Sequence, residues 1–236
     1  RAEPLIAMST PTLPLLIEPD DLEQHLNDPN VRIVDLCRTD IYASQHLPGA
    51  VHLDYTKIIR NTPPVIGLLP EAKILAGIFS ELGIAPHMHV VAYDEEGGGK
   101  AARLLWTLHA MGHTRTSLLN GGLAAWAGEG HRVDAAAVTV APASYQVNVN
   151  NSVVADRAYI LAQLKNPGVC LLDCRSAREF SGAVRSAERA GHIPGAVNLF
   201  WMDNLVSREN PVMKPAAELK KLYEGKGFVS NKRIVS

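Results

Sequence analysis

The feature that most constrains this chain is a segment that occurs twice, in residues 31–54 and again in residues 169–200. In each copy an apolar run ends in an aspartate, and an aromatic residue follows seven positions later. A His-aliphatic-Pro-Gly-Ala turn then leads into a second apolar run. The paired residues are Asp35 and Asp173, then Tyr42 and Phe180. The second copy carries eight additional residues between the aromatic residue and the turn. Matching offsets of this kind predict two domains with one fold.

The pattern continues in parallel after each copy. Residues 68–84 and 214–228 place apolar side chains at helical spacing, with Pro70 and Pro215 near the helix starts. Short Val/Ile-rich runs follow, which are typical of buried parallel strands. Alternating helices and strands of this length predict an α/β fold with helices on both faces of each sheet.

The first half then goes further than the second. Residues 90–113 read as a strand, a Gly-rich turn and a long amphipathic helix. Residues 115–131 add a strand, a Gly-Gly turn and a short helix that holds Trp126. Residues 133–144 have little charge and read as a linker, and residues 145–150 are expected to form a strand that opens the second half.

These elements predict a first domain over 13–142 and a second over 143–236. The second domain lacks counterparts of the elements in residues 93–130, so a central strand would be left unpaired. We therefore expect the natural chain to continue beyond Ser236. Met8 is a candidate for the natural start.

Composition excludes several classes of protein. Lys and Arg total 23 against 24 for Asp and Glu, and a formal charge of -1 gives no field that attracts nucleic acid or anionic membranes. No apolar stretch approaches the roughly 18 residues of a transmembrane helix, and no signal peptide is evident, so a cytoplasmic protein is expected. Three cysteines argue against a disulfide framework.

The repeated motif resembles the tandem-domain rhodaneses, the thiosulfate sulfurtransferases and their mercaptopyruvate-using relatives. The residues that carry it are "VDLCRTDIYASQHLPGAVHLD", "LLDCRSAREF" with "GHIPGAVNLFW", "YDEEGGGKAARLLW" and "LLNGGLAAW". The resemblance implies two tandem domains, each a five-stranded parallel sheet, of which the second is incomplete in this sequence. It also implies a monomer that uses a small-molecule sulfur donor and a thiophilic acceptor, with no cofactor and no metal.

In this family the nucleophile is a cysteine that begins a six-residue loop after the fourth strand of the second domain. Backbone amides in such a loop, together with the N-terminus of the next helix, favour a thiolate and its persulfide. Aligning the fourth strands matches Val90–Ala92 to Ile234–Ser236, so Asp94 corresponds to a position two residues beyond Ser236. We expect the cysteine there, and a chain that ended at Ser236 is expected to be inactive.

The three thiols in the sequence do not satisfy this requirement. Cys37 and Cys174 follow the first strand of each repeat, and Cys170 lies inside that strand. None begins a loop after a fourth strand, so all three are predicted to be structural. Cys170 and Cys174 have no second metal-ligand pair near them in the sequence, which argues against zinc.

The run from Asp94 to Lys100 invites a phosphate-loop interpretation. A Walker loop needs glycine at the position of Asp94 and a hydroxyl residue at that of Ala101. The neighbouring carboxylates of Glu95 and Glu96 would also repel phosphate. The run is therefore interpreted as a degenerate copy of the active loop.

Candidate substrate-binding residues lie between Asp173 and the second His-Pro-Gly-Ala turn. They are Arg175, Arg178, Glu179 and Arg185, with Arg189 nearby. The arginines can form an anion-guiding rim or a solvated surface loop. By the resemblance, Glu179 stands where a substrate-binding arginine is frequent. This departure weakens the case for mercaptopyruvate and favours thiosulfate or another sulfane donor.

The remaining polar residues of the repeats are expected to have local roles. Asp35 and Asp173 are predicted to cap helices or turns, and His46 and His192 to tie their turns to neighbouring backbone.

Two other functions are compatible with the same pattern. One is a non-catalytic binding or sulfur-relay module in which both loops are degenerate. The other is a phosphatase of the dual-specificity cell-cycle kind, which needs a loop one residue longer. The length and the residues of the loop after the fourth strand of the second domain discriminate among the three.

Overall fold

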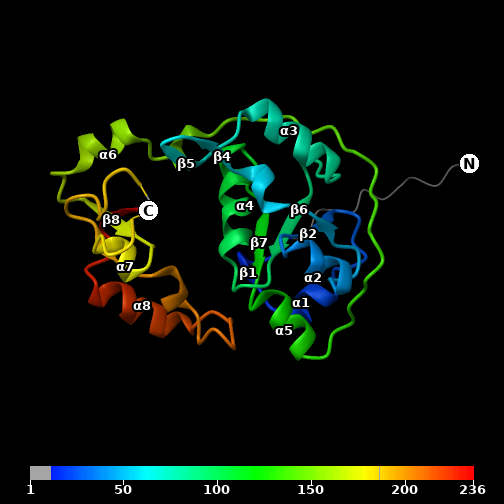
Figure 1. Ribbon diagram of the computed structural model, residues 1–236. Helices are drawn as coiled ribbons and strands as arrows, with labels where there is room; N and C mark the ends of the chain where they lie inside the picture. The colour runs from blue at the N-terminus through cyan, green and yellow to red at the C-terminus, as the bar shows by residue number, and fades with distance from the viewer. Residues whose placement is uncertain (1–11, 186) are drawn as a thin grey trace, which may run out of the picture.

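The computed structural model describes residues 12–185 and 187–236, which form two lobes in Figure 1. The candidate start at Met8 lies outside the described residues. Within the described chain, no helix is long and apolar enough to cross a bilayer.

The first domain is built on a sheet of five parallel strands in the order β1-β7-β6-β2-β3. In chain order these strands are β1 (Leu16–Ile17), β2 (Val31–Asp35), β3 (Val51–His52), β6 (His89–Tyr93) and β7 (Thr116–Leu119). The central strand β6 is buried along its whole length. A five-stranded parallel sheet, as predicted, is therefore confirmed for this domain.

Helices cover both faces of this sheet. They are α1 (Pro19–Glu23), α2 (Thr39–Ser44), α3 (Ala72–Glu81), α4 (Gly99–Ala110) and α5 (Gly122–Gly128). Successive side chains of β6 point to opposite faces, so Val90 and Ala92 join the core under α3 and α4. Val91 and Tyr93 join the second core, which contains side chains of α1 and α5.

A short 3-10 helix, η1 (Tyr55–Ile58), leads from β3 into an antiparallel hairpin. The hairpin consists of β4 (Arg60–Thr62) and β5 (Val65–Leu68), and it leaves Val65 and Ile66 exposed.

Residues 133–144 form no helix, and the strand predicted over residues 145–150 is wrong. This segment runs along the first domain, where the amides of Asn148 and Asn150 donate to the carbonyls of Met111 and Ala110. Tyr145 packs edge-on against Phe79. Tyr145 and Val147 therefore pack against the core of the first domain, while Val149 is exposed, and among the described residues the segment pairs with no strand of the second domain.

The described part of the second domain repeats half of this architecture. Its strands are β8 (Val169–Asp173), β9 (Val197–Asn198) and β10 (Arg233–Val235), which form a parallel sheet in the order β10-β8-β9. Its helical segments are η2 (Asn151–Val153), α6 (Arg157–Gln163), α7 (Ala177–Phe180), η3 (Trp201–Asn204) and α8 (Ala216–Gly225). Among the described residues no strand pairs with the other edge of β10, the edge that β7 covers in the first domain.

Candidate active site

The two repeats form the same turn after their first strands. In each, an aspartate side chain accepts a hydrogen bond from the amide two residues on, from Cys37 to Asp35 at 2.6 Å and from Arg175 to Asp173 at 3.0 Å. The predicted turn role of both aspartates is confirmed. Their electrostatics differ, because burial raises the pKa of Asp35. The Arg175 guanidinium lowers the pKa of Asp173.

The two histidines also make matching contacts. The Nδ1 atom of His46 lies 2.7 Å from the carbonyl oxygen of Tyr42, and that of His192 lies 2.7 Å from the carbonyl oxygen of Phe180. Each imidazole stacks on the aromatic ring of its partner. The prediction that these histidines tie their turns to neighbouring backbone is confirmed.

The register of the two sheets aligns β10 with β6, the fourth strand of the first sheet in chain order. Val31 of β2 lies opposite His89 of β6, and Val169 of β8 lies opposite Arg233 of β10. Since Val31 and Val169 hold equivalent places in the repeat, Val90 corresponds to Ile234, as the sequence alignment predicted. Counting onward from that register, the counterpart of Asp94 falls two positions after Ser236.

In the first domain the loop after β6 forms a cradle of backbone amides, defined here as those of Glu96, Gly98 and Ala101. All three donate to the side chain of Asp94, at 2.9 and 2.8 Å to Oδ1 and at 3.0 Å to Oδ2. Asp94 is fully buried. The cradle therefore holds a carboxylate supplied by its own chain, which agrees with a degenerate copy of an anion-binding loop and leaves no place there for a nucleotide phosphate.

Lys100 pairs with two carboxylates of this loop. Lys100 lies 2.8 Å from Glu95 and 3.4 Å from Glu96; burial acts to lower the pKa of Lys100, but the hydrogen bonds and negative charges of these carboxylates outweigh it, so the pKa is raised. Burial raises the pKa of Glu96.

The environments of Cys37 and Cys174 disfavour a thiolate. Cys37 is buried, and burial together with Asp35 raises its pKa. Burial also raises the pKa of half-buried Cys174. The thiol of Cys170 lies 3.7 Å from the carbonyl oxygen of Gly227, inside the second sheet. These positions support the prediction that the three cysteines are structural.

Two of the four candidate substrate-binding residues make well-defined local contacts. The Arg175 guanidinium donates hydrogen bonds to both carboxylate oxygens of Asp173, and it also donates to the carbonyl of Gly191 at 2.9 Å. Glu179 and Ser176 form a capping box at the start of α7, in which the Glu179 carboxylate accepts from the hydroxyl and the amide of Ser176.

The other candidates lie on the surface. Arg178 is exposed, and Arg185 donates to the carbonyls of Ala187 and Glu188. Arg175 and exposed Arg189 line one cavity of about 630 Å³ at the carboxyl ends of β8 and β10, and Arg178, Glu179 and Arg185 are not among its lining residues. The structure thus brings together two of the five charged residues that the sequence singled out.

A second cavity, of about 470 Å³, lies between the domains. Tyr55 and Trp201, which hold equivalent positions two residues after the paired leucines Leu53 and Leu199, both line it. The sequence analysis did not select them. The signal was present, because each is the first residue of the 3-10 helix that follows its repeat.

One close approach of the two domains lies at Gly97, which has φ of 102°. A Cβ atom on Gly97 would lie 2.5 Å from Cδ1 of Leu205 and 3.2 Å from Cβ of Pro211. Nearby, the amide of Met213 donates to the Asn120 side chain at 2.8 Å. These contacts fix the loop after β6 and the carboxyl end of β7 against the second domain.

Known proteins are similar to this chain in sequence and in fold. The model of the rhodanese-like domain matches residues 18–129 and 156–235. The chain is 33% identical over 224 residues to a thiosulfate sulfurtransferase of Pseudomonas aeruginosa, with 95% of this chain and 82% of the relative covered. It is 38% identical over 190 residues to the thiosulfate sulfurtransferase of Azotobacter vinelandii, with 80% and 70% covered. The crystal structure of SseA, a 3-mercaptopyruvate sulfurtransferase of Escherichia coli, superposes with a TM-score of 0.83 at 29% identity, over 94% of this chain and 87% of that one.

Proposed function

This chain belongs to the rhodanese family, and on that premise we propose that it is a sulfurtransferase that moves a sulfane sulfur from thiosulfate to cyanide or another thiophile. The observation that carries the proposal is the amide cradle after β6. It binds an anionic side chain at the position equivalent to the nucleophile of the family. A loop of the same kind after β10 would hold a cysteine thiolate two residues beyond Ser236.

The reaction needs a nucleophile that is anionic before and after sulfur transfer. The cysteine thiolate attacks the outer sulfur of thiosulfate, a new S–S bond forms, and sulfite leaves with the electron pair of the broken bond. Cyanide then attacks the outer sulfur of the persulfide, and thiocyanate forms as the thiolate is regenerated. Converging amides stabilise both the thiolate and the persulfide anion, so one cradle serves both half-reactions.

Donor choice is proposed to depend on the charged residues at the carboxyl ends of β8 and β10. Arg175 and Arg189 line the cavity there and supply positive charge for an anionic donor. Glu179, at the position where the family frequently has an arginine, instead caps α7. Loss of a paired guanidinium favours thiosulfate over a donor that carries a carboxylate. Roles for Arg178 and Arg185 would be limited to long-range attraction of the anion from the exposed surface.

The cellular setting is also part of the proposal. Balanced charge and free cysteines support a cytoplasmic location. A monomer is proposed because the two domains of one chain already contribute both walls of the interdomain cavity.

The deciding experiment replaces the proposed cysteine, two residues after Ser236, with serine in the full-length protein. Thiocyanate formation from thiosulfate and cyanide should fall by at least ~1000-fold, because serine cannot form a persulfide. The Cys170→Ser variant is the matched control and should retain activity, because Cys170 lines neither of the two cavities. Intact-mass measurement after thiosulfate treatment should show one added sulfur in the wild type and in the control, and none in the variant that lacks the proposed cysteine. A non-cysteine residue at that position, or a wild-type protein without transfer activity, would instead favour a non-catalytic binding or relay module.

The similarity to SseA favours 3-mercaptopyruvate as the second candidate donor. Measured kcat/KM values for the two donors separate the candidates, and we expect thiosulfate to be preferred. The Glu179→Arg variant should raise kcat/KM for 3-mercaptopyruvate relative to thiosulfate. A wild-type preference for 3-mercaptopyruvate would overturn the assignment of the donor and leave sulfur transfer itself intact.

A further inference from the structure

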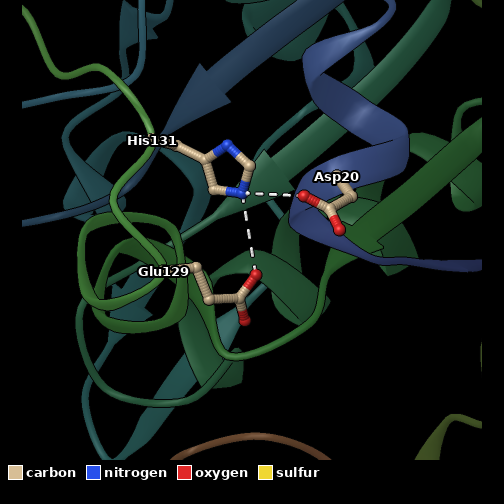
Figure 2. A group of neighbouring side chains, drawn as sticks. All are labelled: Asp20, Glu129 and His131. Atoms are coloured by element: carbon tan, nitrogen blue, oxygen red, sulfur yellow. Dashed lines mark ion pairs between the residues drawn. The ribbon is translucent and has the colours of Figure 1, made fainter.

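A cluster of one histidine and three carboxylates lies in the first domain, where α1 meets the end of α5. Figure 2 shows the His131 ring directed at Asp20 and Glu129. Its Nε2 atom lies 3.4 Å from Oδ1 of Asp20 and 3.6 Å from Oε2 of Glu129. The third carboxylate, that of Glu23, lies 3.2 Å from Nδ1 on the other side of the ring.

The imidazole of His131 is held in place from two directions. Its side chain is 8% exposed, and its ring packs on the buried indole of Trp126 with centroids 4.6 Å apart. The Glu23 carboxylate beside Nδ1 favours the tautomer that carries the proton there, which leaves a lone pair on Nε2. A carboxylate behind the ring is also the arrangement that orients histidine ligands in metal sites.

Hydrogen bonding does not account for the geometry around Nε2. This atom is buried and has no hydrogen-bond partner among the described residues, and its two carboxylate contacts are longer than an ordinary N–H···O bond. Metal–ligand bonds of about 2.0–2.1 Å in a tetrahedron separate neighbouring ligand atoms by about 3.3 Å. The contacts of 3.4 and 3.6 Å fit that spacing, and all three ligand atoms lie within 4.8 Å of one another.

The local charge also suits a cation. Among the described residues, neither Lys nor Arg forms an ion pair with Asp20, Glu23 or Glu129. A divalent ion would neutralise this excess of negative charge, and an imidazole with carboxylates suits zinc and its first-row neighbours.

We propose that His131, Asp20 and Glu129 form a binding site for a divalent first-row metal ion such as Zn²⁺, with Glu23 orienting the histidine. The ion would join α1 to the end of α5 and so lock the edge of the first domain. The site lies in a different part of the first domain from the β6 loop and is independent of sulfur transfer.

Calorimetric titration of Zn²⁺ into the full-length protein, with accessible thiols alkylated, tests the proposal. We expect binding of one ion per chain and at least ~10-fold weaker binding by His131→Gln. The Glu129→Gln variant, on the exposed rim of the site, should also bind Zn²⁺ at least ~10-fold more weakly. It keeps the proposal testable if His131→Gln does not fold. The Asp21→Asn variant is the matched control, because it changes the neighbouring carboxylate of α1 and should bind like the wild type.

Two further readouts distinguish a specific metal site from adventitious binding of Zn²⁺ elsewhere on the protein. Zn²⁺ should raise the Tm of the wild type by about 5 °C when it is present at about 100 times its Kd, and should not raise that of His131→Gln. Sulfur transfer measured on His131→Gln should equal that of the wild type. The proposal is overturned if the wild type does not bind Zn²⁺ at millimolar concentration, or if both variants bind it as tightly as the wild type.

Discussion

The two domains carry one motif in two environments. His46 in the first domain is fully buried, whereas His192 in the second is exposed, yet both make a 2.7 Å contact to the same carbonyl of the repeat. Val90 of β6 and its counterpart Ile234 of β10 also hold the same register against their partner strands. The turn and register are therefore set locally by the motif, while burial depends on the elements packed around it.

The domains differ most at the loop after the fourth strand. In the first domain the Asp94 carboxylate occupies the amide cradle, so these amides are not available to a bound anion. In the second domain the corresponding residue is proposed to be the nucleophile. One position would thus decide whether the same loop stabilises the fold or performs chemistry.

The largest expected effect tests this contrast. The Asp94→Ala variant removes the acceptor of three buried amides and should lower the free energy of unfolding by about 4 kcal/mol, since each bond to a charged group contributes about 1.5 kcal/mol or more. Urea denaturation measures it. The Asp94→Asn variant keeps Oδ1 and should lose about half as much. A loss below about 0.5 kcal/mol for Asp94→Ala would show that the cradle does not need its anion.

Acid should destabilise the first domain through His89. Burial lowers its pKa to about 4, so the folded state holds this histidine neutral while the unfolded chain, with a pKa of about 6.5, takes up a proton. The stabilisation is complete above pH about 6.5, falls as the pH decreases, and is lost near pH 4. It amounts to about 3 kcal/mol. Unfolding measured across this range should depend less on pH in His89→Gln; an identical pH profile would contradict the assignment.

The matched histidines separate motif from environment. The His46→Ala variant should lower the free energy of unfolding by about 2–3 kcal/mol, because it leaves a buried carbonyl unpaired and a cavity beside Tyr42. The His192→Ala variant removes the same contacts at an exposed site and should cost about 1 kcal/mol or less. Equal losses would mean that burial adds nothing to the turn.

The smallest effect concerns Arg175, which occupies the position of Cys37. Its guanidinium is 39% exposed, so Arg175→Gln should cost about 1 kcal/mol or less at pH 7. Because Arg175 lowers the pKa of Asp173, this stabilisation is present above pH about 4 and disappears as the pH falls through that lowered pKa. The unfolding free energies of variant and wild type should therefore converge in acid. Loss of affinity for thiosulfate, beyond this small change in stability, would support the proposed substrate role.

The sequence predicted the parts of the fold that repeat. The paired motifs led to the fold class, the helices around Leu75 and Leu219, and the alignment of Val90 with Ile234. The interpretation of Asp94 as the occupant of a degenerate loop also followed from counting residues.

Other features depended on contacts between segments distant in sequence. The segment around Val147 has the alternating apolar and polar residues of a strand. Its backbone amide at Asn148 nevertheless donates to the carbonyl of Met111 in the first domain and not to a neighbouring strand. Glu179 stood out as a missing arginine, whereas its capping of α7 required the side-chain geometry. The cluster at His131 brings together two segments from opposite ends of the first domain's sequence, one at Asp20 and the other after α5. No local sequence pattern reveals such a contact.

The absent side chain of Gly97 sets the width of the interdomain cleft. The side chain of any larger residue at position 97 would clash with Leu205 and push the two domains apart. At this point the cleft is bounded by the main chain of Gly97 on one side and by the side chain of Leu205 on the other. A redesign for bulkier acceptors should therefore begin by shortening Leu205, with the glycine left untouched.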